Sequence, residues 1–503
     1  MDVVGAGQGQ LRQGFGSFLI LGASALASGC TGTCTGPGCS ALFDATRAVL
    51  HLGGGALITT PDQDPTAGAL SVSGGSAEGQ DWSAWLNDDD LLVGVPDSSR
   101  VRRLPLGALD GSAYLLNQVE LLSGALSGEQ PDDRFGAALA VITRPDGQRD
   151  LWVGASEMEG PDNQIAAGAV YRFADWGSSA EDALLAEQDA DLRVLAEHAF
   201  DHLGERVVAC SDLDGDGIPD VLAAAPWDGL PRGTTASAGD DRGPPLSGRV
   251  YAMLSTELVD AQVLAGRLAV SWTGSTDGEQ LGLSVACDAD LDGDGAADLA
   301  LGAPYADGPV RDARGTVYLL SSATALSAAP AAELAWMTLS GSASNDYLGT
   351  SVAVGDIDGD GLADLLAGAP GTDSARGSAL IWSGASLAEA DTKPRVRLLG
   401  EQSGDHFGQQ VALADLDGDG LDDVLVGAPR AALGEDGFDA GTLYLFRGAA
   451  SFAGFADVRT AEEADGTLVT ASPFLHTGGR LATGDVLGDG VEDLLLLMDI
   501  EPQ

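Results

Sequence analysis

The stretch Asp356-Ile-Asp-Gly-Asp-Gly-Leu-Ala-Asp364 runs directly into the apolar segment Leu-Leu-Ala-Gly-Ala-Pro370, and the chain repeats this arrangement three more times. Each copy reads Asp-x-Asp-Gly-Asp-Gly-x-x-Asp, and the others are Asp212–Asp220, Asp290–Asp298 and Asp415–Asp423. Asp-Gly pairs favour tight turns, and the apolar segment has the length and composition of a buried strand. The pattern therefore predicts a turn between two strands that recurs along the chain.

Carboxylates at positions 1, 3, 5 and 9 of such a turn can converge on one point, and several hard oxygen ligands around one point suit Ca²⁺. An EF-hand would carry a bidentate Glu at position 12, whereas this position holds Ala223, Leu301, Ala367 or Val426. About four Ca²⁺ sites in hairpin turns are predicted. Their ligands are Asp212, Asp214, Asp216 and Asp220; Asp290, Asp292, Asp294 and Asp298; Asp356, Asp358, Asp360 and Asp364; Asp415, Asp417, Asp419 and Asp423.

A metal-free turn of Asp and Gly is the alternative for any single copy. Four copies keep the same four carboxylates while the residues around them differ. Crowded carboxylates repel one another unless a cation offsets their charge, so the repetition favours metal binding.

The repeat extends beyond the acidic copies when it is aligned on the apolar segment. Seven units result, of which the last is the divergent Asp493–Met498, and the first six have the anchors Gly94–Pro96, Gly154–Ser156, Ala224–Pro226, Gly302–Pro304, Gly368–Pro370 and Gly427–Pro429. Five of the turns are preceded by a Phe-Gly or Leu-Gly pair, at Phe135, Leu203, Leu281, Leu348 and Phe407. With the Gly-led strand that follows, each unit supplies four short antiparallel strands, as in a blade of a β-propeller.

The Phe-Gly, acidic-loop and Gly-Ala-Pro elements, recurring in this order, resemble the FG-GAP propeller of integrin α subunits and its bacterial relatives. The resemblance covers essentially the whole mature chain and implies an all-β, seven-bladed β-propeller of four-stranded antiparallel blades. A solenoid is the alternative, but stacked repeats need caps that the sequence does not show. The last unit stops at Gln503 after two strands, so N-terminal strands within 45–72 are predicted to complete the last blade.

Three turns depart from the acidic pattern. In unit two Arg144 stands where a ligand is expected, and unit one has Asn87–Asp90 without alternating spacing, so both are predicted to be metal-free. In unit seven Leu487 replaces the carboxylate at position 3. A weak metal site at most is predicted there, with the ligands Asp485, Asp489 and Asp493.

The 503 residues include 76 acidic and 25 basic side chains, for a formal net charge of −51. Such acidity argues against nucleic acid and against docking on anionic lipid through a basic patch, because the phosphates would be repelled. The 71 glycines and the aromatic content of 5% fit short strands and many turns.

The N-terminal region resembles a bacterial lipoprotein signal: Phe15–Ala27 is apolar but too short for a membrane span, and it leads into Ala-Ser-Gly-Cys30. Cleavage by an ordinary signal peptidase is the alternative. The predicted domains are a signal peptide at 1–29, a flexible tether at 30–43 and the propeller at 44–503. Lipidation of Cys30 would anchor a protein secreted across the inner membrane to the cell envelope, at the outer membrane or the cell surface, with no other membrane contact.

Two of the five cysteines lie just before acidic turns of neighbouring units, Cys210 in unit three and Cys287 in unit four. Two small buried thiols on inner strands are the preferred interpretation, and a disulfide between the two units stays open.

No nucleophile elbow, phosphate-binding loop or His-rich cluster occurs in the sequence. His202 and His406 precede a Leu-Gly or Phe-Gly pair, a position that holds Arg134, Gln280 or Tyr347 in other units, so repeat geometry accounts for them. An enzyme is therefore not predicted. The resemblance implies a calcium-binding surface propeller that binds a protein or glycan, and the alternatives are a structural subunit of an envelope assembly or a polysaccharide-active enzyme.

In an antiparallel blade the turn between strands one and two lies on one face of the ring, and the loop between strands two and three lies on the other. The longest loops should therefore face away from the acidic turns. Loops on a rigid scaffold often carry binding sites, and Trp, Tyr and Arg are frequent anchors. The predicted ligand face includes Trp227, Arg232, Tyr305 and Arg430, and the alternative is that these are idle solvent-exposed loops.

Overall fold

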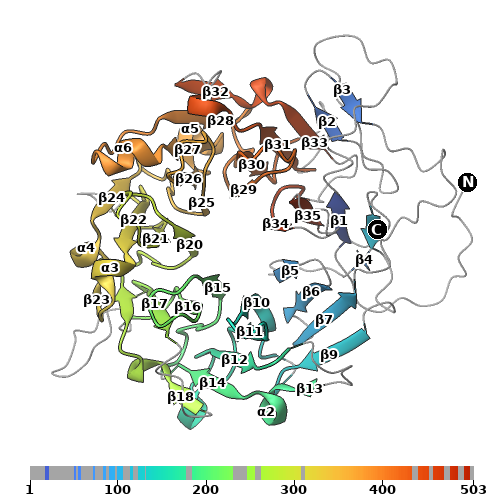
Figure 1. Cartoon of the computed structure of the whole chain (residues 1–503), viewed down its shortest axis with the longest axis vertical. Coiled ribbons are helices and arrows are strands. Elements are labelled where there is room, and N and C mark those ends of the chain that lie inside the picture. The colour runs from blue at the N-terminus through green and yellow to red at the C-terminus, as the bar shows by residue number, and fades with distance from the viewer. Residues whose placement is uncertain are drawn as a thin grey trace, which may run out of the picture.

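Strands dominate the computed structural model of the chain, and the helices among its described residues are no longer than about one turn, so the predicted all-β class is confirmed (Figure 1). The structure describes residues 17–21, 50–52, 55–57, 72–73, 83–86, 90–96, 99–105, 114–116, 123–130, 132–176, 184–196, 198–229, 246–254, 262–307, 312–432, 440–452, 457–469, 476–484 and 492–498. Within them, no helix is long and apolar enough to span a membrane.

The strands form seven sheets that stand around a ring, and each sheet runs from the centre of the ring outward (Figure 1). The first strands are β5 (Ser83–Leu86), β10 (Phe135–Thr143), β15 (Arg206–Cys210), β20 (Ser284–Ala289), β25 (Val352–Gly355), β29 (Gln410–Ala414) and β34 (Leu481–Gly484). Neighbouring first strands contact one another, and β34 contacts β5, so the ring closes as in a β-propeller.

The second and third strands continue each sheet with antiparallel pairing. The second strands are β6 (Asp90–Val95), β11 (Arg149–Ala155), β16 (Asp220–Ala225), β21 (Asp298–Ala303), β26 (Asp364–Ala369), β30 (Asp423–Ala428) and β35 (Asp493–Met498). In the first six sheets the third strands are β7 (Arg100–Pro105), β12 (Ala169–Phe173), β17 (Arg249–Met253), β22 (Thr316–Ser321), β27 (Ser378–Trp382) and β31 (Thr442–Phe446).

The fourth strands of these six sheets lie toward the rim. They are β9 (Ser123–Ser127), β14 (Leu192–Leu195), β19 (Ser271–Thr273), β24 (Met337–Ser340), β28 (Val396–Leu399) and β33 (Gly466–Val469). Short helices lie in the connections, namely α2 (Ala186–Asp189), α3 (Ser322–Ala325), α4 (Ala331–Leu334), α5 (Thr372–Ala375), α6 (Gly384–Ala388) and the 3₁₀ turns η3 (Pro161–Asn163), η5 (Ala265–Arg267), η6 (Ala450–Phe452) and η7 (Ala461–Glu463).

Four sheets receive a fifth strand at the rim, which pairs in parallel with the fourth strand. Each of these strands belongs to the connection between the third and fourth strands of the following sheet in sequence. They are β13 (Leu184–Leu185), β18 (Gln262–Leu264), β23 (Ala329–Pro330) and β32 (Val458–Thr460). The exchange covers an edge that would otherwise expose unpaired backbone groups, and it ties neighbouring sheets together.

N-terminal strands do complete the last sheet, but they are not all the predicted ones. β35 pairs with β1 (Ser17–Leu21), which pairs in turn with β4 (Val72–Ser73) and β8 (Tyr114–Leu116). β2 (Leu50–Leu52) pairs instead with β33 of the sixth sheet and with β3 (Gly55–Leu57). Because the last sheet is assembled from these separate pieces, seven blades stay a prediction.

β1 lies inside the segment predicted to be a signal peptide. Cleavage before Cys30 would remove β1 and leave β35 to pair with another strand. The rest of the predicted signal peptide, the tether with Cys30, and Arg232, Asp485 and Asp489 lie outside the described residues.

The hydrophobic core lies between the sheets rather than in one central layer. One cluster, for example, packs Leu366 and Ile381 of the fifth sheet against Val411, Val426 and Phe446 of the sixth. The second strands that follow the four acidic turns are buried along their whole length, which explains why they read as continuous apolar runs.

The two glycine motifs of the repeat meet at the interface between neighbouring sheets. A side chain on Gly368, at the end of β26, would collide with the backbone of Gly408, which lies just before β29 of the next sheet. Gly302 and Gly349 form the same contact one sheet earlier. The Phe-Gly and Gly-Ala-Pro motifs are thus two halves of one close backbone approach. A sixth copy of the pair, Thr477-Gly478 against Gly427, was not recognised in the sequence because Thr replaces the apolar residue.

Gly408→Ala should destabilise the protein far more than Gly404→Ala. Both glycines have positive φ, +87° and +96°, so both substitutions cost about 1–2 kcal/mol of backbone strain. The added Cβ meets the backbone of Ser378 and Ala369 at position 408 and nothing within 4 Å at position 404. We expect at least about 2 kcal/mol of additional loss for Gly408→Ala, measured by denaturant unfolding. Equal losses in the two variants would contradict this account.

Candidate metal centres and the opposite face

The four acidic turns are built alike, because two glycines allow the backbone to fold back on itself. In the turn between β15 and β16, Gly215 and Gly217 have φ of +80° and +88°, a region that other residues rarely adopt. Their N–H groups donate to the two oxygens of Asp212, at 2.7 and 2.6 Å. The first carboxylate of the pattern is therefore held by backbone donors that the glycines present.

The ninth carboxylate is fixed from the other end of the turn. Asp220 begins β16, and its Oδ2 accepts the N–H of Leu213 at 2.9 Å. Asp298 and Asp364 accept the corresponding N–H groups of Leu291 and Ile357 at 2.8 and 2.9 Å. These bonds orient the carboxylates before any ligand binds.

Three of the turns bring candidate ligand oxygens within 4.8 Å of one another. The groups are Asp212, Asp214 and Asp220; Asp290, Asp292 and Asp294; Asp356, Asp358 and Asp360. In the fourth turn Asp415 accepts the N–H groups of Gly418 and Gly420, both at 2.8 Å, as its counterparts do. Each of the three groups thus contains three of the four predicted ligands, and Asp216, Asp298 and Asp364 fall outside them.

The electrostatics of the turns fit a cation with hard ligands. Burial, and then the charge of neighbouring carboxylates, raises the pKa of Asp298, Asp364 and Asp423 to about 7. Oδ1 of Asp417 is buried and makes no hydrogen bond of normal geometry. Oxygen-only donors of this kind suit Ca²⁺ or Mg²⁺ better than a soft transition metal.

A guanidinium group stands among the carboxylates of the second sheet's turn. Nε of Arg144 lies 3.4 Å from Oδ1 of Asp150, and the same side chain pairs with Asp175. Arg172 contacts the other oxygen of Asp150 at 2.7 Å. Asp150, with a side chain 1% exposed, thus has two positively charged partners. In the first and last sheets, the turns lie largely outside the described residues.

Neighbouring turns are linked to one another. A disulfide joins Cys210 and Cys287, directly before the turns of the third and fourth sheets, so the bridge that the sequence left open is present and the preferred interpretation of two free thiols is wrong. The sequence places the two cysteines at equivalent positions of neighbouring units but does not give their distance, and in the structure the adjacent first strands come close enough for a Cα–Cα distance of 5.7 Å. Further along the ring, Asp422 N–H donates to the carbonyl of Asp356 at 2.9 Å.

The opposite face carries a second set of carboxylates that the sequence analysis missed. An acidic residue stands two positions before each Phe-Gly or Leu-Gly pair, and all five are buried: Asp133, Asp201, Glu279, Asp346 and Asp405. Their side chains close the turn, as when Asp405 accepts the N–H of Gln402 at 2.9 Å. The residue between the acid and the pair has a positive φ in all five turns. His202 and His406 occupy this position, so they are part of the turn geometry. The recurring spacing in the sequence could have revealed these acids.

His198, Asp201 and Asp228 also offer ligand atoms within 4.8 Å of one another on this face. Each has a local partner: Nδ1 of His198 lies 3.5 Å from Asp201, and Asp228 pairs with Arg249 at 2.8 Å. Burial, and then the charge of Asp228, raises the pKa of Asp201 to about 6. The cluster is accounted for by the local packing of one blade.

Three of the four residues of the predicted ligand face lie beside these turns. Trp227 packs on His202 with ring centroids 5.0 Å apart, and Tyr305, 43% exposed, lies 5.4 Å from Tyr347. The N–H of Arg430 donates to the carbonyl of Asp405. They belong to three different sheets, so they line a shared face rather than one pocket.

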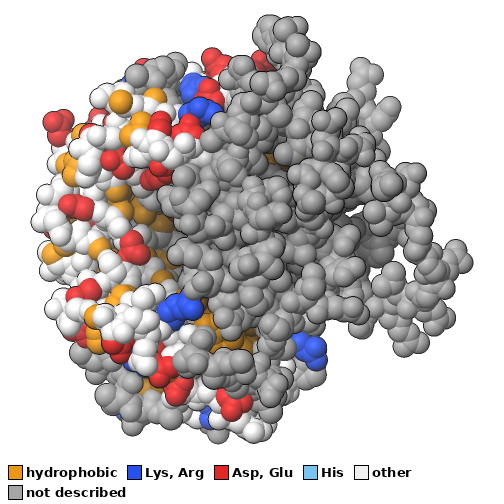
Figure 2. Space-filling view, turned by 45° about the vertical axis from the view of Figure 1, so that its right-hand side comes forward, with side chains coloured by type: hydrophobic (Ala, Val, Ile, Leu, Met, Phe, Trp, Pro, Cys, Tyr) orange, Lys and Arg blue, Asp and Glu red, His pale blue; other side chains and the backbone are white. Residues whose placement is uncertain are grey.

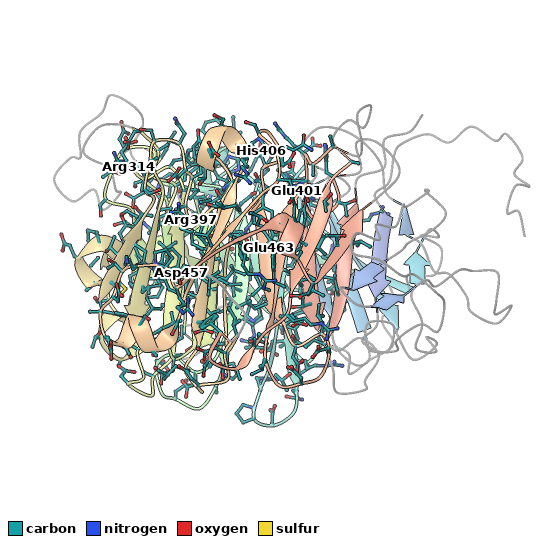
Figure 3. The ribbon with its side chains drawn as sticks, turned by 90° about the horizontal axis from the view of Figure 1, so that it is seen from above. Arg314, Arg397, Glu401, His406, Asp457 and Glu463 are labelled. Atoms are coloured by element: carbon teal, nitrogen blue, oxygen red, sulfur yellow. A yellow bond between two sulfur atoms is a disulfide. The ribbon has the colours of Figure 1, made fainter. Side chains whose placement is uncertain are left out.

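Strand direction separates this face from the acidic turns. The turn containing His406 precedes β29, and the acidic turn 415–423 follows it, so the two lie at opposite ends of one strand. Figure 3 shows His406 near the same edge of the ring as Arg314, which comes from the loop before β22. Carboxylates are spread over much of the described surface in Figure 2, in keeping with the net charge.

Comparison with known proteins connects these features to one repeat family. The model of the FG-GAP repeat matches residues 203–252, 282–320, 348–382 and 407–446. Each match begins at the Phe-Gly or Leu-Gly pair, contains one acidic turn and ends in the third strand. Each of the four repeats thus coincides with the first three strands of one sheet.

Among curated proteins, human phosphatidylinositol-glycan-specific phospholipase D is 29% identical over 408 residues, which are 73% of this chain and 45% of that protein. Integrin alpha-PS2 of Drosophila melanogaster is 33% identical over 30% of this chain and 10% of its own, and integrin alpha-V of Gallus gallus is 36% identical over 19% and 9%. The chain therefore spans less than half of each of these relatives. A solved structure described as "Structure of Dos1 propeller" aligns with 82% of this chain and 74% of its own, at 10% identity and a TM-score of 0.39.

Proposed function

Since the chain carries four FG-GAP repeats in an integrin-type β-propeller, we propose that it is a calcium-binding cell-surface propeller that binds a macromolecule. The observation that carries this proposal is the pairing of two unlike faces on one rigid ring. One face holds four turns of preoriented carboxylates, and the other presents Trp227, Tyr305 and Arg430 beside buried turns.

Ca²⁺ is the cation that the turns fit best, and when bound it would offset the mutual repulsion of their carboxylates. The chain's own contribution is to hold those carboxylates. Backbone N–H groups of the glycines fix Asp356 and its counterparts, and the buried start of the second strand fixes Asp364. Because the turn connects the first two strands of a sheet, its order is coupled to the order of that sheet.

A binding role is favoured over a catalytic one. The carboxylates that could serve an acid–base reaction are engaged in the metal turns or, on the opposite face, in closing backbone turns. The phospholipase activity in the human relative's name belongs to a protein of which this chain covers 45%. A structural subunit of an envelope assembly is the second candidate, which the same scaffold would serve equally.

Removal of calcium should lower the melting temperature. A ligand at about 100 times its dissociation constant stabilises the folded state by roughly 2.7 kcal/mol per site. Asp358→Ala should abolish or weaken uptake at one site and leave three, whereas Asp146→Ala, in the turn that contains Arg144, should leave uptake unchanged. Calorimetry and thermal melts with and without chelator measure both effects. Unchanged melting together with no calcium uptake would refute the proposed sites.

Binding should depend on the face opposite the metal turns. A partner is sought by pull-down from envelope extracts and on a glycan panel with product analysis, which also detects an enzymatic activity. Replacing Trp227, Arg232, Tyr305 and Arg430 by Ala should weaken binding at least about tenfold, while calcium uptake and melting stay near the unmodified values. Tyr305→Ala and Arg430→Ala test the face without disturbing the stacking of Trp227 on His202. An equal loss from charge reversals on the metal face alone would contradict this assignment.

We further propose that Cys30 carries a lipid that holds the protein at the cell envelope. Mass spectrometry of the unsubstituted protein should find a chain that begins at Cys30 and carries a lipid, and Cys30→Ser should move the protein from the membrane fraction to the soluble fraction. Unchanged membrane association of the variant would indicate another anchor. A mature chain that retains Ser17–Leu21 would instead favour the pairing of β1 with β35.

A further inference from the structure

In each of the four sheets with an acidic turn, one residue at the end of the third strand comes opposite the ninth carboxylate of the turn. Strand pairing sets this position: Val424 pairs with Phe446, so Arg447 comes opposite Asp423. The corresponding residues in the other three sheets are Leu254, Ser321 and Ser383. Arg447 is therefore the one charged residue at this position among the four sheets.

Arg447 reaches into its turn. Its Nη1 lies 2.9 Å from Oδ2 of Asp417, the carboxylate at position 3, and its backbone N–H is anchored on Asp465 at 3.0 Å. In the fourth sheet, the neutral Ser321 occupies this place and contacts Asp294 at 3.3 Å. In the turn 415–423, a carboxylate is thus already paired with a cation of the protein.

The pair is only partly buried, with the side chain of Arg447 45% exposed and that of Asp417 18% exposed. The long guanidinium side chain can therefore withdraw into solvent when another cation takes its carboxylate. The second sheet shows the stronger form of the same substitution, because there Arg144 sits inside the turn beside Asp150.

We propose that Arg447 competes with calcium for Asp417 and makes the turn 415–423 the weakest of the four sites. The inference rests on the proposed calcium binding. Calcium must displace the guanidinium from Asp417, and the remaining positive charge nearby repels the ion. An ion pair at this exposure changes an equilibrium by up to about fivefold, and the repulsion adds to that, so the site should bind about five- to tenfold more weakly than its neighbours. This site therefore fills at higher calcium concentrations than the other three sites.

The test is calcium titration of the metal-depleted full chain by calorimetry. The unmodified protein should show three tighter sites and one weaker site. Arg447→Ser, which installs the residue found at this position in the fourth and fifth sheets, should tighten the weak site about five- to tenfold. Arg447→Lys keeps the charge and should leave the site weak. Arg314→Ser removes one positive charge on the other face and should leave calcium uptake unchanged.

Two further readouts separate competition from a general effect on folding. The gap between the unmodified protein and Arg447→Ser should shrink at high salt, because salt screens a partly exposed ion pair. Asp417→Asn added to Arg447→Ser should weaken the site that the single variant had tightened, which assigns it to this turn. Uptake of four calcium ions with identical affinities in the unmodified protein and in Arg447→Ser would overturn the role of Arg447 alone. No uptake by the folded, unmodified chain would overturn the calcium proposal as well.

Discussion

The contact between two glycines of neighbouring sheets is the constraint on which the rest of the structure depends. Gly368 at the end of one sheet's second strand lies against Gly408 at the entry to the next, and neither position has room for a Cβ. This contact sets the separation of adjacent sheets at their inner ends. The apolar side chains farther out, such as Ile381 and Phe446, then fill the space that the contact leaves. A Cβ added at either glycine would meet backbone atoms of the neighbouring sheet.

The same constraint places both functional faces. In the four sheets with an acidic turn, the glycine turn begins the first strand and the acidic turn ends it, so each of these strands places one carboxylate cluster at its far end. The carboxylates are then held by backbone donors rather than by other side chains, as in the bonds from Gly359 and Gly361 to Asp356. Variation among the four acidic turns therefore includes residues beside the turn, as where Arg447 adds a positive charge next to Asp417.

Repetition is what made most of this predictable from the sequence. The acidic turns, their carboxylates and the all-β class follow from a pattern that recurs at fixed spacing. The disulfide between Cys210 and Cys287 did not follow, because sequence spacing does not show that two inner strands are adjacent. The buried acids such as Asp405 were overlooked because single carboxylates in loops are common and only their alignment marks them. The pairing of β1 with β35 and of β2 with β33 could not be predicted, since strands of three to five residues carry almost no periodicity.

The parallel strands exchanged at the rim have a consequence for how such a ring could grow or shrink in evolution. β18 sits on the sheet of β14, yet it is encoded between the third and fourth strands of the next sheet. A gene segment cut at the borders of one sheet would therefore include the rim strand of the preceding sheet and lack the rim strand that pairs with its own fourth strand. The stretch of sequence that can be duplicated or lost together with all of its strand partners therefore does not coincide with the strands of one sheet. Where a sheet receives such a rim strand, a change in blade number by recombination within the loops should replace one rim strand with another.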